Sequence, residues 1–350
     1  MTPLDEAGFA TLAGLCGGAV FGAAARSARY CVMGALEDAV YGDDTTRLRM
    51  LGVSAGVAML GAALLAAAGL LDPGESWRLA RGFAPAGAAL GGLMFGYGMA
   101  LVGTCAMGAL ARIGGGDIRS LAVVSVIGVA AVATAAGPLS PFRLWIAPPG
   151  PPVESLAVMA GRATGVAPLL IWLLAGALTL AAALVGADVP RQRGPLLWGA
   201  AVGVAAIGGW AATAALSQGF SVMAVDSFSF VEPIGEALLY VMTEARYIAP
   251  GFAVGGVAGV TFGAALAAWR RGDFRWETSD DARELRRQLT GAALMGMGGV
   301  LALGCTAGQG LTALSILAPG APVAMLGILL GARAGLFVLI EGVAAPRRRG

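Results

Sequence analysis

Apolar runs about as long as a bilayer is thick recur along this chain of 350 residues. A helix needs about 20 apolar residues to cross the hydrocarbon core. Six runs approach or reach that length: 51–71, 121–136, 167–185, 197–216, 249–269 and 322–340. Only 13% of the residues are charged, against about 25% in soluble domains. The sequence therefore predicts an all-α, polytopic transmembrane helix bundle embedded in a lipid bilayer.

About nine spans are predicted: 7–25, 50–71, 83–109, 118–137, 165–186, 196–217, 247–269, 289–310 and 321–341. Asp5 and Glu6 precede the first span, which thus lacks the positive start of a cleaved signal peptide. Arginines gather in 26–49, 187–195, 270–288 and the C-terminus, which favours a cytoplasmic place for these segments. The N-terminus and the acidic segment 218–246, an amphipathic helix over 226–246, are expected outside. Four arginines oppose this orientation: Arg78, Arg81, Arg143 and Arg162.

A cysteine-centred pattern occurs twice, 200 positions apart. Its first copy comprises Gly91, Gly96, Gly98, Leu101, Cys105 and Gly108, and its second Gly291, Gly296, Gly298, Leu301, Cys305 and Gly308. The copies fall in the third and eighth spans, so they are expected to cross the membrane in opposite directions. Inverted-topology repeats are common in transporters. We expect an N-terminal repeat over 1–140 (motif 91–116), a proline-rich linker over 141–164 and a C-terminal repeat over 165–345 (motif 291–315), all in one membrane domain.

Glycines spaced by four residues predict close helix packing. One series is Gly255, Gly259 and Gly263, and another is Gly327, Gly331 and Gly335. Small residues at this spacing allow helix backbones to approach one another inside a bilayer. A compact bundle is expected.

Several classes of function are disfavoured by composition. The chain has no histidine and a formal net charge of +2, so histidine-ligated metal and imidazole catalysis are excluded. The only run of three basic residues is Arg347–Arg349, which makes a nucleic-acid partner unexpected. No CxxC pair joins the four cysteines, and their spacing fits no zinc site. We expect no cofactor, no metal and no catalytic residues, hence no enzyme.

Cys105 and Cys305 are the strongest candidate site residues. Each is followed by glycine at the third position, which predicts broken helices near the membrane midplane. Amides at half-helix N-termini favour an anion, and a soft, polarisable thiol suits a sulfur atom better than an oxyanion. Thr306 and Gln309 lie beside Cys305. Cys16 is interpreted as a packing residue.

Other charged residues are less decisive. Arg333 is placed near mid-bilayer, where an ionisable group is a functional candidate unless it pairs with Glu341 or a backbone carbonyl. Glu232, Glu236 and Glu244 are interpreted as a solvated outer face rather than as proton-transfer carboxylates.

Three separated motifs resemble the YeeE/YedE family of sulfur or thiosulfate transporters. Residues 304–312 resemble its GCTxGxG(L) signature, residues 103–116 its GxCxxGxxxRxGxG pattern, and residues 26–31 its Arg-Ser element before an aromatic-Cys pair. The resemblance implies thiosulfate uptake at the bacterial inner membrane, with Cys31, Cys105 and Cys305 relaying the anion through S–H···S hydrogen bonds. Gln309 stands where histidine is common in the family, and Ala106 where threonine or serine is typical. Some relatives are associated with selenium or other sulfur compounds.

Two alternatives remain open from the residues. One is a membrane sulfurtransferase that forms a persulfide on Cys31 or Cys105 and hands sulfur to a cytoplasmic carrier protein. The other is a structural membrane protein, in which cysteine substitutions affect only stability. The repeated cysteines favour transport of a small sulfur anion, with a cytoplasmic sulfur-carrier protein as a further expected partner.

Overall fold

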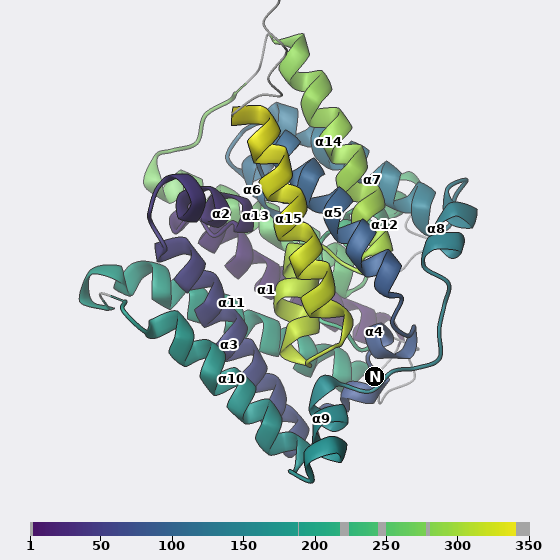
Figure 1. Ribbon diagram of the computed structural model, residues 1–350. Helices are drawn as coiled ribbons and strands as arrows, with labels where there is room; N and C mark the ends of the chain where they lie inside the picture. The colour runs from purple at the N-terminus through teal and green to yellow at the C-terminus, as the bar shows by residue number, and fades with distance from the viewer. Residues whose placement is uncertain (1–2, 188, 218–223, 244–249, 278–280, 341–350) are drawn as a thin grey trace, which may run out of the picture.

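The structure, a computed structural model, describes residues 3–187, 189–217, 224–243, 250–277 and 281–340. The regular elements in these ranges are helices, and there are also two isolated β-bridges. In chain order they are α1 (Pro3–Ser27), α2 (Val32–Tyr41), α3 (Thr46–Ala67), η1 (Pro73–Glu75), α4 (Trp77–Ala80), α5 (Pro85–Val102), α6 (Ala106–Gly114), α7 (Ile118–Ala135), α8 (Ser140–Ile146), α9 (Leu156–Thr164), α10 (Pro168–Leu184), α11 (Val189–Ser217), α12 (Val231–Met242), α13 (Phe252–Arg271), α14 (Ala282–Leu301), η2 (Gly308–Ala313) and α15 (Gly320–Ile340). They form a helical bundle (Figure 1).

Seven helical stretches are long and apolar enough to cross a membrane, and an eighth is the bent pair α9 and α10. The chain is therefore a multi-pass membrane protein. The count of nine is not confirmed, because the predicted span 289–310 falls on α14 and the break after it. α14 starts with a charged turn that contains Arg283, Glu284, Arg286 and Arg287, so it carries too short an apolar stretch to qualify.

Glycine contacts hold the main helix pairs close together. A Cβ on Gly22 of α1 would overlap the carbonyl oxygen of Val260 in α13, and one on Gly259 of α13 would overlap that of Leu15 in α1. The pair α5 and α15 uses the same device, with Gly96 against Ile328 and Gly331 against Leu93. The small-residue spacing thus forms the backbone contacts that the sequence predicted.

The two cysteine motifs lie on neighbouring helices that run in opposite directions. Gly98 of α5 packs against Gly291 of α14, while Gly91 packs against Gly298. Antiparallel packing is the direction expected of inverted copies. The repeat and the domain boundaries drawn from it stay predictions.

Short helices occur in two segments that were not predicted to span the membrane. The proline-rich segment 141–164 carries most of α8 and all of α9. The segment expected as an amphipathic helix contains α12, and its residues Glu244 and Arg246 lie outside the described residues. The same holds for Glu341 and Arg347–Arg349.

Arginine-rich loops meet at one end of the bundle, which we call the arginine-rich end. The guanidinium of Arg26 donates to the carbonyl of Asp273, that of Arg271 to Ser27, and that of Arg49 to Val185. The first two contacts join the loops after α1 and α13, and the third joins the loop after α10 to the start of α3. In Figure 1, α2 lies at the upper left and α9 at the bottom. We call the end that carries α4 and α9 the opposite end.

The helix contacts lead to a stability prediction. Gly22→Ala should lower the free energy of unfolding by about 1–3 kcal/mol, because the new methyl group overlaps the Val260 carbonyl. The matched control is Gly208→Ala in α11, where an added Cβ meets nothing within 4 Å; it should be neutral or stabilising by about 0.5–1 kcal/mol. Thermal unfolding of the detergent-solubilised variants measures both. Equal stabilities would contradict the close approach of α1 and α13.

Candidate functional site

Cys105 and Cys305 occupy matching positions at interruptions between helices. After α5, Gly103 takes a positive φ of 78°, and Cys105 then caps α6, with the Gly108 amide donating to its Sγ at 3.4 Å. After α14, Leu303 and Gly304 take positive φ values of 56° and 151°. The Gly308 amide donates to Cys305 Sγ at 3.5 Å. The predicted broken helices are therefore present, and a thiol lies at the start of the helical segment that follows each break.

Cys31 lies beside Cys105. It precedes α2 as its N-cap residue, and its thiol interacts with both the thiol and the backbone amide of Cys105. Cys305 in turn lies within electrostatic range of Cys105. The structure thus brings together three cysteines that are far apart in sequence, with Cys105 close to Cys31 and with Cys305 in its surroundings. Cys16 is exposed on α1, and all four thiols are free.

A fourth loop reaches the same region ahead of α12. In this loop, Ser229 Oγ lies 3.9 Å from Cys305 Sγ, and the Phe228 carbonyl accepts a hydrogen bond from Thr312. The starts of α2, α6, α12 and the helical segment after Cys305 therefore converge. Helix N-termini carry partial positive charge, so this arrangement favours an anion.

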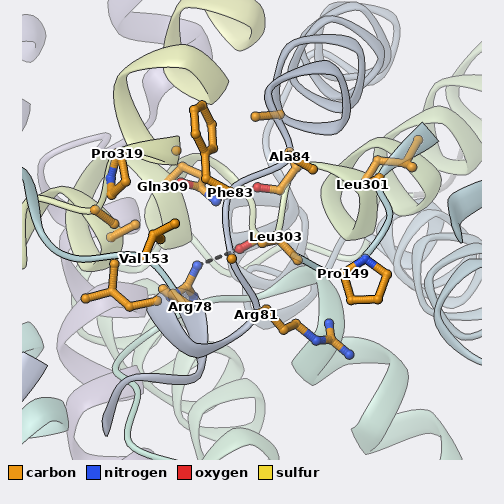
Figure 2. Close-up of a pocket in the computed structure, with 18 of the residues that line it drawn as sticks. Arg78, Arg81, Phe83, Ala84, Pro149, Val153, Leu301, Leu303, Gln309 and Pro319 are labelled. Atoms are coloured by element: carbon orange, nitrogen blue, oxygen red, sulfur yellow. Dashed lines mark hydrogen bonds between the residues drawn. The ribbon is translucent and has the colours of Figure 1, made fainter. Parts of the chain in front are cut away.

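Arg78 was interpreted from sequence as an arginine on the wrong side, and the structure gives it a different role. Its buried guanidinium pairs with Asp226 at 2.9 and 3.0 Å and donates to the Leu303 carbonyl at 2.5 Å. Figure 2 shows the Arg78 side chain reaching Leu303. Leu303 directly precedes the glycine and cysteine of the second break, so Arg78 fixes that break. The partner residue lies 148 positions away, which is why one sequence could not reveal the pair.

Two other arginines of the opposite end, Arg81 and Arg162, have local partners. The Arg81 guanidinium stacks over the Trp77 ring at 5.3 Å, and Arg162 pairs with Glu154 at 2.6 Å. Arg81 and Arg143 line a small cavity of about 60 Å³ together with Gln309.

Two larger cavities of about 660 Å³ each approach the cysteines. One opens at the opposite end, is lined by Arg81, Asp226 and Glu232, and reaches Ser229. The second contains Tyr30 and Arg49 in its walls and reaches Cys105 and Thr306. Arg49 belongs to the arginine-rich end, so the cavities approach the thiols from different ends of the bundle.

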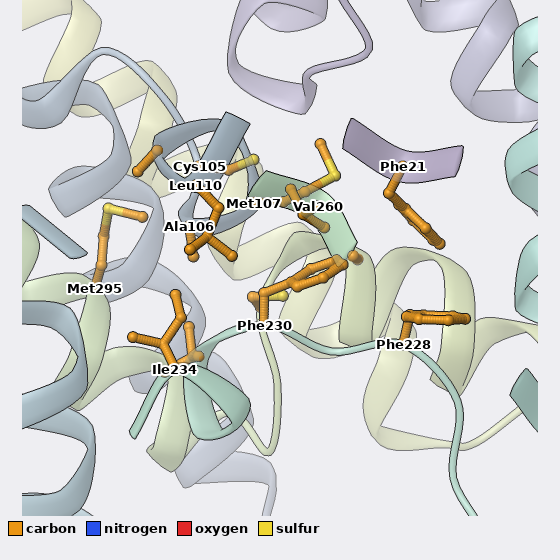
Figure 3. Close-up of a cluster of buried hydrophobic side chains, with 14 of the residues drawn as sticks. Phe21, Cys105, Ala106, Met107, Leu110, Phe228, Phe230, Ile234, Val260 and Met295 are labelled. Carbon is orange, nitrogen blue, oxygen red and sulfur yellow. The ribbon is translucent and has the colours of Figure 1, made fainter. Parts of the chain in front are cut away.

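Aromatic rings separate the two cavities. Tyr30 lines one cavity and lies edge-on to Phe21 at 6.4 Å, while Phe21 lies 5.0 Å from Phe228, which lines the other. Phe230 completes the cluster, and Figure 3 shows it with Phe21, Phe228 and Cys105. All four rings are buried, so the region between the two cavities is apolar.

The remaining predicted site residues divide into two groups. Thr306 and Gln309 are both 4% exposed beside Cys305, and the Gln309 amide donates to the Ala302 carbonyl while its Oε1 has no partner in the described part of the chain. Arg333 is exposed on α15 and lines none of these cavities. Its possible partner Glu341 lies outside the described residues. Among described residues, no group of three or more potential metal ligands is found.

Glu232 was expected on a solvated outer face, but it lies elsewhere. It is half-buried in the wall of the cavity that leads to Ser229. Burial raises the pKa of its carboxyl to about 7, although Arg78 and Arg81 lower it in part. The carboxyl therefore changes charge near neutral pH. Sequence alone showed the acid but not its burial.

Comparison with known proteins agrees with this geometry. The family described as sulphur transport matches residues 27–334, which is most of the chain. The thiosulfate transporter TsuA of Escherichia coli (strain K12) is 26% identical over 317 residues, covering 86% of each chain. The matched range includes the three clustered cysteines and both helix breaks. The chain therefore belongs to the sulphur transport family, the YeeE/YedE family that its motifs resemble.

Proposed function

We propose that this protein is an inner-membrane permease that takes up thiosulfate, or a closely related sulfur-containing anion. The observation that supports it most is the cluster of Cys305, Cys105 and Cys31 beside two cavities that approach from different ends. The anion passes from thiol to thiol by hydrogen bonds to sulfur and leaves chemically unchanged. The relative TsuA, named a thiosulfate transporter, supports the choice of substrate.

Hydration free energy gives a physical reason for thiols in such a path. A small anion must shed water among the buried rings, and the convergent helix N-termini supply partial positive charge in place of that water. A thiol offers a soft sulfur contact that suits the terminal sulfur of thiosulfate. Sulfate has only hard oxygen atoms, so it gains less from the same contacts. The cluster of thiols therefore favours thiosulfate over sulfate.

We assign the orientation of the protein in the membrane from the charges of its two ends. We place the arginine-rich end and the C-terminus in the cytoplasm and the N-terminus outside, because arginine-rich loops usually stay on the cytoplasmic side. The anion then enters through the cavity that reaches Ser229 and meets Cys305 first. We propose that Thr306 and Gln309 line the path beside Cys305. Arg333 is left out because its side chain is exposed. A cytoplasmic sulfur-carrier protein is the proposed receiver.

The thiol relay predicts the effect of cysteine substitutions. Cys31→Ala, Cys105→Ala and Cys305→Ala should each reduce uptake of radiolabelled thiosulfate to background, because each removes one contact of a single path. Cys16→Ala is the matched control and should keep uptake, since Cys16 is exposed on α1. Uptake is measured in cells that lack other thiosulfate transporters, with protein levels checked in the membrane.

Two results would contradict this proposal. Wild-type uptake by Cys105→Ala and Cys305→Ala would remove the relay. A covalent sulfur adduct on the protein after exposure to thiosulfate, seen by intact mass, would instead favour the sulfurtransferase alternative.

The buried carboxyl of Glu232 predicts pH dependence. Below about pH 7 it is neutral, and above about pH 7 it is negative, so it then repels an anion in the cavity that leads to Cys305. Thiosulfate uptake should fall as external pH rises through about 7. Glu232→Gln should flatten this profile, whereas Glu75→Gln, at an exposed acid of the same end, should leave it unchanged. An identical profile for wild type and Glu232→Gln would refute the role of this carboxyl.

A further inference from the structure

Two buried hydroxyl groups accompany the thiols. Thr104 Oγ1 lies 3.9 Å from Cys31 Sγ, and Ser229 Oγ lies 3.9 Å from Cys305 Sγ. Both residues are nearly inaccessible, at 4% and 8% exposure. Each contact joins two different loops of the site. A hydroxyl group therefore lies beside a thiol at two places in the site.

The glycine three positions after each cysteine makes room for these hydroxyls. A Cβ on Gly108 would overlap Thr104 Oγ1, and a Cβ on Gly308 would lie 2.7 Å from Ser229 Oγ. In the first case the hydroxyl comes from the loop directly before α6, the helix that contains the glycine, and in the second from the loop before α12. Two different chain segments thus place a hydroxyl group at equivalent positions, each beside the start of a helical segment. This coincidence gives a structural reason for the repeated glycine.

Neither hydroxyl is committed to the backbone. Other serine and threonine side chains in these helices, such as Ser125, Thr134 and Thr179, donate to the carbonyl four residues earlier. For Thr104 and Ser229, the contacts seen in the described chain are the weak ones to sulfur. A hydroxyl proton rotates freely about the C–O bond. Both groups can therefore turn toward an anion without losing a strong hydrogen bond.

We propose that Thr104 and Ser229 are specificity-determining residues that donate hydrogen bonds to the oxygen atoms of the anion while the neighbouring thiols contact its terminal sulfur. This inference rests on the proposed transport function and defines its substrate class. The recognised chemistry is a thiosulfonate group, in which one sulfur atom carries both oxygen atoms and a terminal sulfur. Sulfate lacks the terminal sulfur, and hydrosulfide lacks the oxygen atoms. Each hydroxyl–thiol pair thus distinguishes thiosulfate from both.

Removal of each hydroxyl tests the proposal. Ser229→Ala and Thr104→Val should each lower thiosulfate uptake at low concentration roughly tenfold or more, as expected for one lost hydrogen bond to a charged group. The conservative variants Ser229→Thr and Thr104→Ser should restore most of the uptake, which loss of packing alone would not predict. The matched controls are Ser125→Ala and Thr134→Val, whose hydroxyls bond within their own helices.

The outcomes separate this inference from the proposed function. Wild-type uptake in both Ser229→Ala and Thr104→Val, alongside an inactive Cys305→Ala, would overturn the role of the hydroxyls and leave the thiol relay standing. Loss of uptake without recovery in the conservative variants would also overturn it. Absence of thiosulfate uptake by the wild-type protein would refute the proposed function itself. Membrane levels and thermal unfolding of every variant accompany the uptake measurements.

Discussion

Interrupting a helix inside a membrane exposes amide and carbonyl groups that lipid cannot satisfy, and the site depends on how this chain resolves that constraint. At the first break the Cys105 thiol accepts from the Gly108 amide, and at the second Cys305 accepts from Gly308. The carbonyl of Leu303 accepts from the buried guanidinium of Arg78. The thiols that satisfy the broken backbone are thus also the groups that face the proposed path.

Holding the second break with a buried ion pair has an energetic cost. Burying Arg78 and Asp226 removes two charges from water, and such a pair contributes little net stability. Its contribution is geometric, because it holds the positive-φ residues Leu303 and Gly304 in place before Cys305. Glycine contacts supply the rigid frame around it. The close backbone packing of α1 with α13 and of α5 with α15 keeps the four loops within reach of one another.

Much of the fold was predictable from local patterns. The apolar runs predicted the helical bundle, and Gly108 and Gly308, three positions after the two cysteines, predicted broken helices, since both features depend on residues that are neighbours in sequence. The span count was less predictable. Charged residues in the first turn of α14 lie on a helix that is otherwise apolar and tightly packed, and hydropathy alone does not decide how such a helix sits. Arg333, placed near mid-bilayer by counting residues, is exposed on α15.

The sequence by itself determined a membrane-embedded helical chain with two equivalent thiols at helix breaks, because hydropathy and backbone conformation are local properties. Only the tertiary structure decided which groups meet there. Arg78 pairs with Asp226, which is 148 positions away in the sequence, and Ser229 contacts Cys305, which is 76 positions away. Such contacts arise from the packing of whole helices, which no short stretch of sequence encodes. The thiols were visible in the sequence, whereas the hydroxyls and the ion pair that accompany them became visible only in the fold.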